Sequence, residues 1–246
     1  MSEQPGSPTA FEELVDHYDA ARPRYPAALY AQLEAALDLS GSVLELGAGT
    51  GIATRELQGR AGSLVSADLG PKMLGRLRAL TPSVPVVVAR AEALPFADSA
   101  FDVVCAAQMW HWVDTQAATP EVLRVLRPGG ALALWWNEVA ADGLPWWDAQ
   151  QDRLEAGNPR YSRGYRARDY GLELAPHFTD VQHWTTAWER ELDWPTYERW
   201  LRSKSYVQAL GDVETFLAAE RVSLAEHFPD GRIVEPFEVS LWIART

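Results

Sequence analysis

Cysteine is almost absent from this chain, and cationic side chains are outnumbered. The single cysteine, Cys105, excludes a disulfide framework within the chain. The 22 Lys and Arg residues face 34 Asp and Glu residues, for a formal net charge of −12 at pH 7. Proteins that bind nucleic acids or anionic membranes normally carry a basic face. The composition therefore argues against both as partners.

Long hydrophobic runs are also missing. No apolar stretch approaches the ~20 residues that a transmembrane helix needs. Residues 1–13 are polar and acidic and lack the basic and apolar parts of a signal peptide. Both observations predict a cytoplasmic protein. With 246 residues, 47% of them hydrophobic, the chain can bury the core of one large domain.

Tryptophan is absent before Trp110, although the chain contains 11 of them. The two parts of the chain therefore have different packing or binding tasks. His, Cys, Asp and Glu residues nowhere recur at the spacing of metal ligands, so no metal site is predicted.

The order of apolar segments predicts an α/β fold. Up to residue 137, short buried strands alternate with helices, a pattern typical of a parallel sheet covered on both faces. The later part predicts a helical cover and an antiparallel edge to the sheet. The predicted helices are 11–20, 27–39, 50–60, 71–80, 119–126, 144–157, 196–210 and 213–228, and the predicted strands are 42–46, 63–67, 84–88, 101–107, 131–136, 179–188 and 238–245.

A glycine-rich segment, Val-Leu-Glu-Leu-Gly-Ala-Gly-Thr-Gly, runs from the first predicted strand into a helix. Gly47, Gly49 and Gly51 let the backbone turn sharply and let a ligand approach without Cβ atoms in the way. A dinucleotide fingerprint would have its third glycine at position 52, where this chain has Ile52. A nicotinamide cofactor is therefore the weaker alternative.

Acidic residues follow the second and third predicted strands. Asp68 ends the second strand, where a carboxylate can accept hydrogen bonds from both ribose hydroxyls. Glu92 follows the third strand within Ala-Arg-Ala-Glu-Ala-Leu-Pro-Phe. Phe-Asp-Val-Val then begins the fourth strand, and Leu-Arg-Pro-Gly-Gly precedes the fifth.

Taken together, these segments resemble the class I S-adenosylmethionine-dependent methyltransferases over residues 10–137. The resemblance implies a Rossmann-like, seven-stranded, mostly parallel sheet with an antiparallel edge strand, and S-adenosylmethionine as cofactor with S-adenosylhomocysteine as product. It implies one overall domain, with N-terminal cap helices (1–40), a cofactor-binding core (41–137) and a substrate cover with the final strands (138–246). The residues that it assigns to the cofactor are Glu45, Gly47, Ala48, Gly49 and Gly51 for the methionine end, Asp68 for the ribose, Leu69 and Met73 for the adenine faces, and Ala91 and Glu92 for the adenine edge. Many members have Asp where this chain has Arg90, so backbone groups of Ala91 are the expected adenine contact.

Two local signatures resemble the small-molecule branch that includes trans-aconitate methyltransferase-like proteins. One begins at Tyr18 (Tyr-Asp-Ala-Ala-Arg-Pro-Arg-Tyr-Pro), and the other begins at Gln108 (Gln-Met-Trp-His-Trp), which we assign to the cofactor. In that branch the N-terminal segment folds over the cofactor, so Tyr18 and Arg22 are candidates for binding its carboxylate end. A guanidinium pairs bidentately with a carboxylate. The alternative is that Arg22 caps a helix or pairs with a surface acid.

His111 is the candidate catalytic base, because it lies just beyond the carboxyl end of the fourth predicted strand and imidazole titrates near neutrality. The alternative is a histidine that only shapes the pocket, since methyl transfer mainly needs alignment. Four tryptophans end two adjacent predicted strands, and some of them should wall the acceptor pocket, with ordinary packing as the alternative for each. The residues assigned to the acceptor are Trp110, His111, Trp112, Trp136 and Asn137.

An Arg-rich loop is predicted over residues 158–170. It holds Arg160, Arg163, Arg166 and Arg168. The functional interpretation is a lid that recognises a carboxylate or phosphate, and the favoured one is a solvated loop with surface ion pairs.

These observations predict an enzyme that methylates an O, N or C centre of a small molecule. The alternative is a cofactor-binding protein of the same fold that is non-methylating or regulatory, since a fold does not determine the chemistry. No nucleic-acid or membrane partner is expected, and no particular oligomeric state is predicted.

Overall fold

The structure, a computed structural model, describes residues 22–163 and 169–246, which divide into two compact units. The core unit comprises residues 24–137, 169–186 and 239–246. The helical unit comprises, among the described residues, 22–23, 138–163 and 187–238. The predicted helix 11–20 lies outside the described residues.

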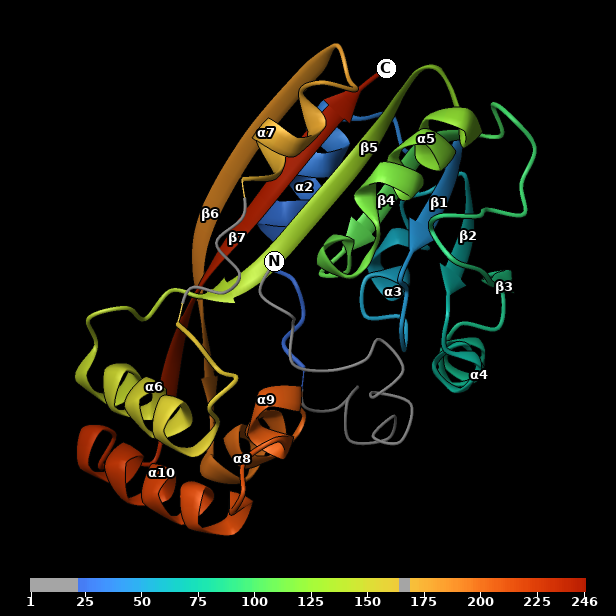
Figure 1. Ribbon diagram of the computed structural model, residues 1–246. Helices are drawn as coiled ribbons and strands as arrows, with labels where there is room; N and C mark the ends of the chain where they lie inside the picture. Colours follow the sequence, from blue (N-terminus) through green and yellow to red (C-terminus); the bar gives the residue numbers. More distant parts are fainter. Residues whose placement is uncertain (1–21, 164–168) are drawn as a thin grey trace. The chain divides into compact units, whose positions relative to one another are not determined.

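One seven-stranded sheet has the order β3-β2-β1-β4-β5-β7-β6 (Figure 1). Its strands are β1 (Ser42–Leu46), β2 (Ser63–Asp68), β3 (Val86–Val88), β4 (Phe101–Ala107), β5 (Leu126–Val139), β6 (Asp180–Leu192) and β7 (Ile233–Arg245). Strands β1 to β5 pair in parallel, and β7 runs opposite to β5 in Figure 1. The predicted Rossmann-like, mostly parallel sheet with an antiparallel edge is therefore confirmed.

The strand order reverses direction beside β1. Starting from β1, the chain adds β2 and β3 on one side, and then returns to place β4 on the other. Leu44 pairs with both Val65 of β2 and Val104 of β4. Such a switch point is where open α/β sheets bind ligands, at the carboxyl ends of the strands.

Helices of the core unit lie before β1 and between several of its strands along the chain. They are α2 (Ala27–Ala36), α3 (Thr54–Leu57), α4 (Pro71–Leu80), α5 (Thr115–Val125) and α7 (Tyr170–Leu174), together with the 3-10 turn η2 (Trp110–Trp112). Carboxylates begin two of them: Asp114 accepts from the N–H of Gln116 at 3.1 Å, and Asp169 accepts from the N–H of Gly171 at 2.9 Å. These caps satisfy N–H groups that have no partner within the helix.

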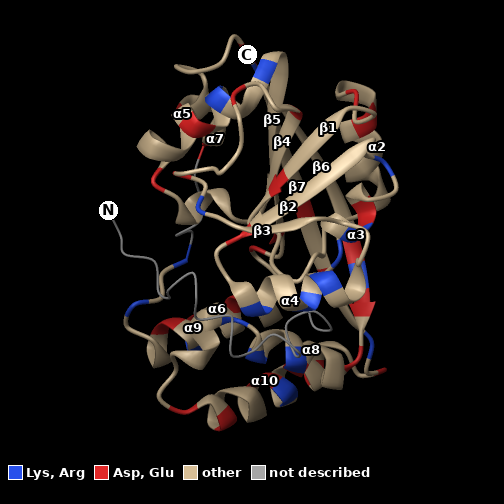
Figure 2. Ribbon diagram, turned by 90° about the vertical axis from the view of Figure 1, so that its right-hand side faces the viewer, with Lys and Arg blue, Asp and Glu red and all other residues tan. Residues whose placement is uncertain are grey.

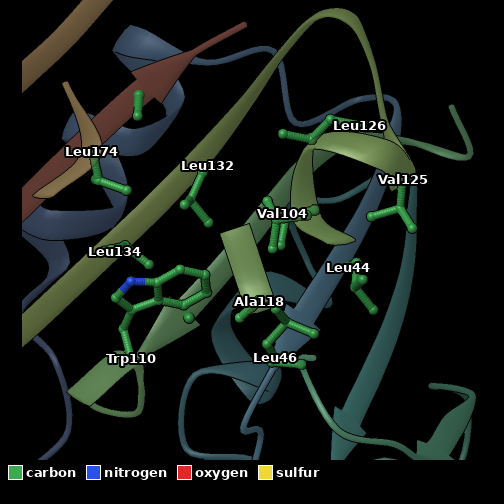
Figure 3. Packing of buried hydrophobic residues seen from close by; sticks show 14 of the residues in the cluster. Leu44, Leu46, Val104, Trp110, Ala118, Val125, Leu126, Leu132, Leu134 and Leu174 are labelled. Atoms are coloured by element: carbon green, nitrogen blue, oxygen red, sulfur yellow. The ribbon is translucent and has the colours of Figure 1, made fainter. Parts of the chain in front are cut away.

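The core of this unit lies between the sheet and helices α5 and α7 (Figure 3). Leu132 and Leu134 of β5 and Val104 of β4 are fully buried and belong to one apolar cluster. Leu132 and Leu134 share a face because alternate side chains of a strand point the same way. Leu174 of α7 closes the cluster on one side. Burying side chains of this size contributes roughly 1.5–3 kcal/mol each.

The helical unit packs four helices around its own apolar cluster. These are α6 (Pro145–Gly157), α8 (Trp194–Arg202), α9 (Ser205–Gln208) and α10 (Val213–His227). Trp146, Tyr197 and Trp200 are among its buried side chains. Acidic and basic residues are interspersed along α10 (Figure 2).

Several predicted bounds differ from the observed ones. The predicted helix 50–60 is reduced to α3, because the preceding residues form the turns of the glycine loop. The predicted helix 119–126 begins earlier, at Thr115, where Asp114 caps it. The predicted helix 196–210 is two helices, α8 and α9, separated at Ser203. Strands β5, β6 and β7 are longer than predicted, while β3 is shorter.

Within residues 22–163 and 169–246, no helix combines the length and apolarity that crossing a bilayer requires.

Candidate active site

The loop after β1 requires glycine at three positions. Gly47, Gly49 and Gly51 have φ angles of 64°, 56° and 87°, in the left-handed region that favours glycine. A Cβ at Gly47 would lie 2.5 Å from Cγ of Met109, and one at Gly51 would lie 2.9 Å from Cγ of Leu77. A Cβ at Gly49 would meet nothing within 4 Å. The backbone at Gly49 therefore faces open space, where a ligand can approach it closely.

Glu45 lies on β1, inside the fold, two residues before Gly47. Its side chain is 1% exposed and its Oε2 accepts hydrogen bonds from Oγ1 of Thr54 at 2.5 Å and Oγ of Ser66 at 2.8 Å. Burial raises the pKa of the Glu45 carboxyl to about 7, against the opposing effect of these hydrogen bonds. The carboxyl group therefore ties β1 to β2 and α3.

Asp68 joins the ends of β1 and β2. Its Oδ2 accepts from the N–H of Gly49 at 2.8 Å, and its Oδ1 accepts from the N–H of Gly70 at 2.7 Å. Each carboxylate oxygen can accept more than one hydrogen bond. The half-buried Asp68 therefore shapes the glycine loop.

The two residues expected at the adenine faces differ in exposure. Leu69, directly after Asp68, is 42% exposed, whereas Met73 of α4 is buried. Ala48 of the glycine loop is also buried, and its N–H donates to the carbonyl of Ala67 at 3.1 Å. Leu69 thus presents an apolar surface at the end of β2.

Glu92, which follows β3, connects the β3 end of the sheet to the start of α5. Oε1 of Glu92 accepts from the N–H of Asp114 at 3.0 Å, and Oε2 lies 3.6 Å from Nε of Arg90. Ala91, between the two, is buried. The side chain of Arg90 is largely exposed, so an exposed cation stands where an acid was expected from the resemblance.

Gln108 holds the carboxyl ends of β4 and β5 together. Its φ of 56° is rare for a residue other than glycine. Its Nε2 donates to the carbonyl of Asn137 at 2.8 Å, and its N–H donates to the carbonyl of Trp135 at 2.9 Å. Strained backbone of this kind is concentrated at functional sites.

His111 and Trp112 lie in η2, directly after β4. Both are half-buried, and their ring centroids are 5.1 Å apart. Nε1 of Trp136 donates to Nδ1 of His111 at 3.4 Å. Trp136 itself is buried on β5 and stacks on Tyr170 at a centroid distance of 3.8 Å. His111 is therefore supported by an aromatic layer that comes from β5 and α7.

Comparison with known proteins decides what this arrangement is. A model of the methyltransferase domain family matches residues 44–134. An uncharacterized methyltransferase of Mycobacterium tuberculosis is 38% identical over 197 residues, which cover 80% of this chain and 77% of that protein. The chain belongs to the methyltransferase family. A methyltransferase-like protein of Schizosaccharomyces pombe is 38% identical over 149 residues, or 59% of this methyltransferase and 57% of that protein.

Solved structures share the fold of this methyltransferase. A candidate type II methyltransferase of Anaeromyxobacter dehalogenans has a TM-score of 0.72 and 26% identity, with 91% of this chain and 97% of that chain covered. A phosphoethanolamine N-methyltransferase of Haemonchus contortus, solved with phosphomonomethylethanolamine and S-adenosylhomocysteine, has a TM-score of 0.57 and 16% identity, with 98% of this chain and 60% of that chain covered. At that identity the likeness shows the fold alone. The chain is thus a methyltransferase of the class I fold, a family that uses S-adenosylmethionine.

Three of the four clustered tryptophans are packed inside the methyltransferase. Trp110 is fully buried in the core, and its Nε1 donates to Oε1 of Glu173 at 3.2 Å (Figure 3). Trp135 and Trp136 are also buried, so Trp112 is the member of the group with accessible surface. The indole of Trp110 packs in the core beside α7, and its role at the acceptor pocket stays a prediction.

The described contact of Arg22 is at the end of a helix, which is the alternative to a cofactor contact. Its Nη2 donates to the carbonyl of Ser203 at 3.0 Å, at the C-terminal end of α8 in the helical unit. The last carbonyls of a helix lack partners within it and favour a cation. In the methyltransferase structure Arg22 therefore caps a helix, and a role at the cofactor carboxylate stays a prediction. Tyr18 lies outside the described residues.

The Arg-rich loop likewise follows the favoured interpretation where it is described. Arg163 forms ion pairs with Asp148, Asp152 and Glu155, all on α6. Exposed pairs of this kind contribute about 0–1 kcal/mol each. Arg160 is exposed, and Arg166 and Arg168 lie outside the described residues.

Sequence reasoning missed several residues that support this site. Thr54 and Ser66 contact Glu45, and Tyr170 contacts Trp136, but none of the three matches a motif. The contact between Ser66 and Glu45 joins positions 21 apart in the chain, and a hydroxyl followed through the strand alternation could have suggested it. Among the described residues, no group of three or more His, Cys, Asp or Glu side chains could hold a metal ion.

Proposed function

We propose that this methyltransferase transfers the methyl group of S-adenosylmethionine to a small-molecule acceptor at the carboxyl edge of strands β1, β2 and β4. The observation that carries the proposal is the pair of hydrogen bonds from Gly49 and Gly70 to the carboxylate of Asp68. These two hydrogen bonds keep the glycine loop next to the Asp68 carboxylate, at the topological switch point of the sheet. A carboxylate at this place can accept hydrogen bonds from ribose hydroxyls.

The residues present fit this cofactor. Open space above Gly49 suits the close approach of a ligand to the backbone, and the exposed Leu69 suits an adenine face. Asp68 would bind the ribose hydroxyls, while Glu45 would support the loop from within through Thr54. When bound, the cofactor supplies an electrophilic methyl group on a positively charged sulfur.

The acceptor is proposed to lie beside His111 and Trp112. Both side chains are half-buried and follow β4 directly. Trp112 would offer an aromatic face, which suits both an apolar acceptor and a nearby sulfonium cation. Alignment of this kind supplies much of the rate of a transfer reaction, because it removes the entropy of bringing two reactants together.

Two further features support a dissolved small molecule, methylated in the cytoplasm. The net charge of −12 argues against a nucleic acid or an anionic membrane as partner. The lone Cys105 is buried in β4, which fits a reducing compartment.

The experiment incubates the full chain with methyl-labelled S-adenosylmethionine and a dialysable metabolite pool, and in parallel with protein, RNA and DNA fractions. We expect label only in the metabolite pool. The Asp68→Ala variant serves as the background control, since it should bind the cofactor weakly. Label in a macromolecular fraction, or cofactor binding without transfer to any fraction, would refute the proposal.

A further inference from the structure

The contact between Trp136 and His111 determines which ring nitrogen of the histidine carries a proton. An indole N–H can only donate, so in the 3.4 Å contact Nδ1 of His111 must accept. A neutral imidazole has one N–H group, which must then be at Nε2. The structure thus selects one of the two neutral tautomers of His111.

The indole is held firmly in the orientation that this requires. Trp136 is 5% exposed and stacks on Tyr170 with an interplanar angle of 12°. Trp242 packs edge-on against the same ring at 5.5 Å, and His183 in turn stacks on Trp242 at 4.2 Å. All of these residues belong to the core unit. The indole cannot turn without disrupting this layer.

The opposite tautomer would carry a local cost. If Nδ1 of His111 carried the proton, it would face the N–H of Trp136, and two donors would meet. Leaving a buried donor without an acceptor costs about 1–3 kcal/mol. Trp136 is deeply buried, so its N–H has little access to water as a substitute. The Nε2–H form of His111 is therefore strongly preferred.

We propose that Trp136 is a positioning residue that holds His111 in the neutral Nε2–H tautomer, so that His111 serves the acceptor as a hydrogen-bond donor and not as the general base. The inference rests on the proposed function for the presence of an acceptor beside His111. A ring with its lone pair engaged at Nδ1 and a proton on Nε2 takes no proton from a nucleophile. The acceptor must then reach the site with its lone pair available, as a carboxylate oxygen does at neutral pH, and must offer an oxygen to the Nε2–H group.

The first test needs no acceptor. Nitrogen-15 NMR of the labelled protein at alkaline pH, where histidine rings are neutral, distinguishes protonated from unprotonated ring nitrogens, and His111→Gln assigns the signal among the 5 histidines. We expect His111 to show a protonated Nε2 and an unprotonated Nδ1. In Trp136→Phe, which keeps an aromatic ring but removes the N–H, the Nδ1–H form should become populated at a tenth or more. Trp135→Phe is the matched control, because Trp135 is the adjacent buried indole and its Nε1 has no hydrogen-bond partner within residues 22–163 and 169–246.

Either of two results would overturn the inference. One is a protonated Nδ1 in the wild-type protein, which decides the matter even if Trp136→Phe does not fold. The other is a folded Trp136→Phe protein with the same tautomer as the wild type. Because neither result depends on methyl transfer, failure of the proposed function would be seen separately, in the labelling experiment.

A second test uses an acceptor found by that labelling experiment. His111→Gln places an amide N–H close to the position of Nε2–H, whereas His111→Ala has no donor. A donor role predicts that His111→Gln retains kcat/KM within about threefold and that His111→Ala loses about tenfold, which is one hydrogen bond. Equal losses of a hundredfold or more in both variants would indicate a base and contradict the inference.

Discussion

The carboxylate of Asp68, at the end of β2, accepts a hydrogen bond from the backbone N–H of Gly49, in the loop that follows β1. Asp68→Ala should therefore weaken S-adenosylhomocysteine binding at least tenfold, since it removes both the support of the loop and the acceptor for the ribose. Isothermal titration calorimetry measures this change. Asp142→Asn, an exposed acid outside the core unit, is the control and should leave the affinity unchanged. Equal affinity of Asp68→Ala and the wild type would refute the ribose assignment.

Alanine at two positions of the glycine loop should act differently. At Gly49 the added Cβ has open space, so the substitution should cost about 1–2 kcal/mol for the left-handed backbone alone and should mainly reduce ligand binding. At Gly47 the Cβ would meet Met109, so Gly47→Ala should destabilise the fold further. Urea unfolding measures both. The collision involves both Cγ and Cβ of Met109, at 2.5 and 2.6 Å, so Met109→Gly is the variant that removes it. Gly47→Ala should cost less stability in the Met109→Gly background than in the wild type, and an equal cost would show that the collision is not the cause.

The buried Glu45 should make stability depend on pH. Its pKa is raised from 4.5 to about 7 in the folded protein, so the folded state binds the proton more tightly than the unfolded state does. Proton binding by Glu45 therefore contributes on the order of 3 kcal/mol to the free energy of unfolding. This contribution is fully present below about pH 4.5 and is lost as the pH rises through about 7. The free energy of unfolding should fall across this window in the wild type.

Glu45→Gln should flatten this dependence, because the amide does not titrate and can still accept from Thr54 and Ser66. Glu226→Gln, an exposed residue of α10, should retain the wild-type slope. Parallel slopes for Glu45→Gln and the wild type between about pH 4.5 and 7 would contradict the assignment.

Two arginine–glutamate pairs of the helical unit should differ sharply in their energetic effect. Nε of Arg190 lies 2.5 Å from Oε2 of the fully buried Glu235, whose pKa is raised by burial. Arg190→Met leaves this carboxyl group unpaired and should cost about 3–5 kcal/mol, and the double variant with Glu235→Leu should regain much of that loss.

Arg232 and Glu191 form the exposed counterpart, and Arg232→Met should leave the free energy of unfolding nearly unchanged, because water screens an exposed pair. A double-mutant cycle in urea measures both pairs. Similar coupling energies for the two pairs would show that burial does not control their contribution.

The cofactor half of the fold could be predicted because its determinants are local. Buried strands read as continuous apolar runs, and Gly47 and Gly49 stand where positive φ angles require them. The end of β2 placed Asp68 correctly at the carboxyl edge, since parallel strands all end there.

The helical unit and the burial of the tryptophans could not be predicted in the same way. Arg22 and Ser203 are 181 positions apart, and their contact depends on how the helical unit packs. The burial of Trp110 depends on Glu173 and Leu174 of α7, a helix that the sequence pattern did not predict. Large aromatic side chains suit both a pocket wall and a core, so residue type alone does not separate the two.

A crystal structure of the protein with S-adenosylhomocysteine tests the central claim most directly. The account predicts the ribose hydroxyls within hydrogen-bond distance of the Asp68 carboxylate, the amino-acid part over Gly49, and the sulfur facing the side of the site that holds His111 and Trp112. A ligand bound away from the carboxyl ends of β1 and β2, or a ribose with no contact to Asp68, would contradict it.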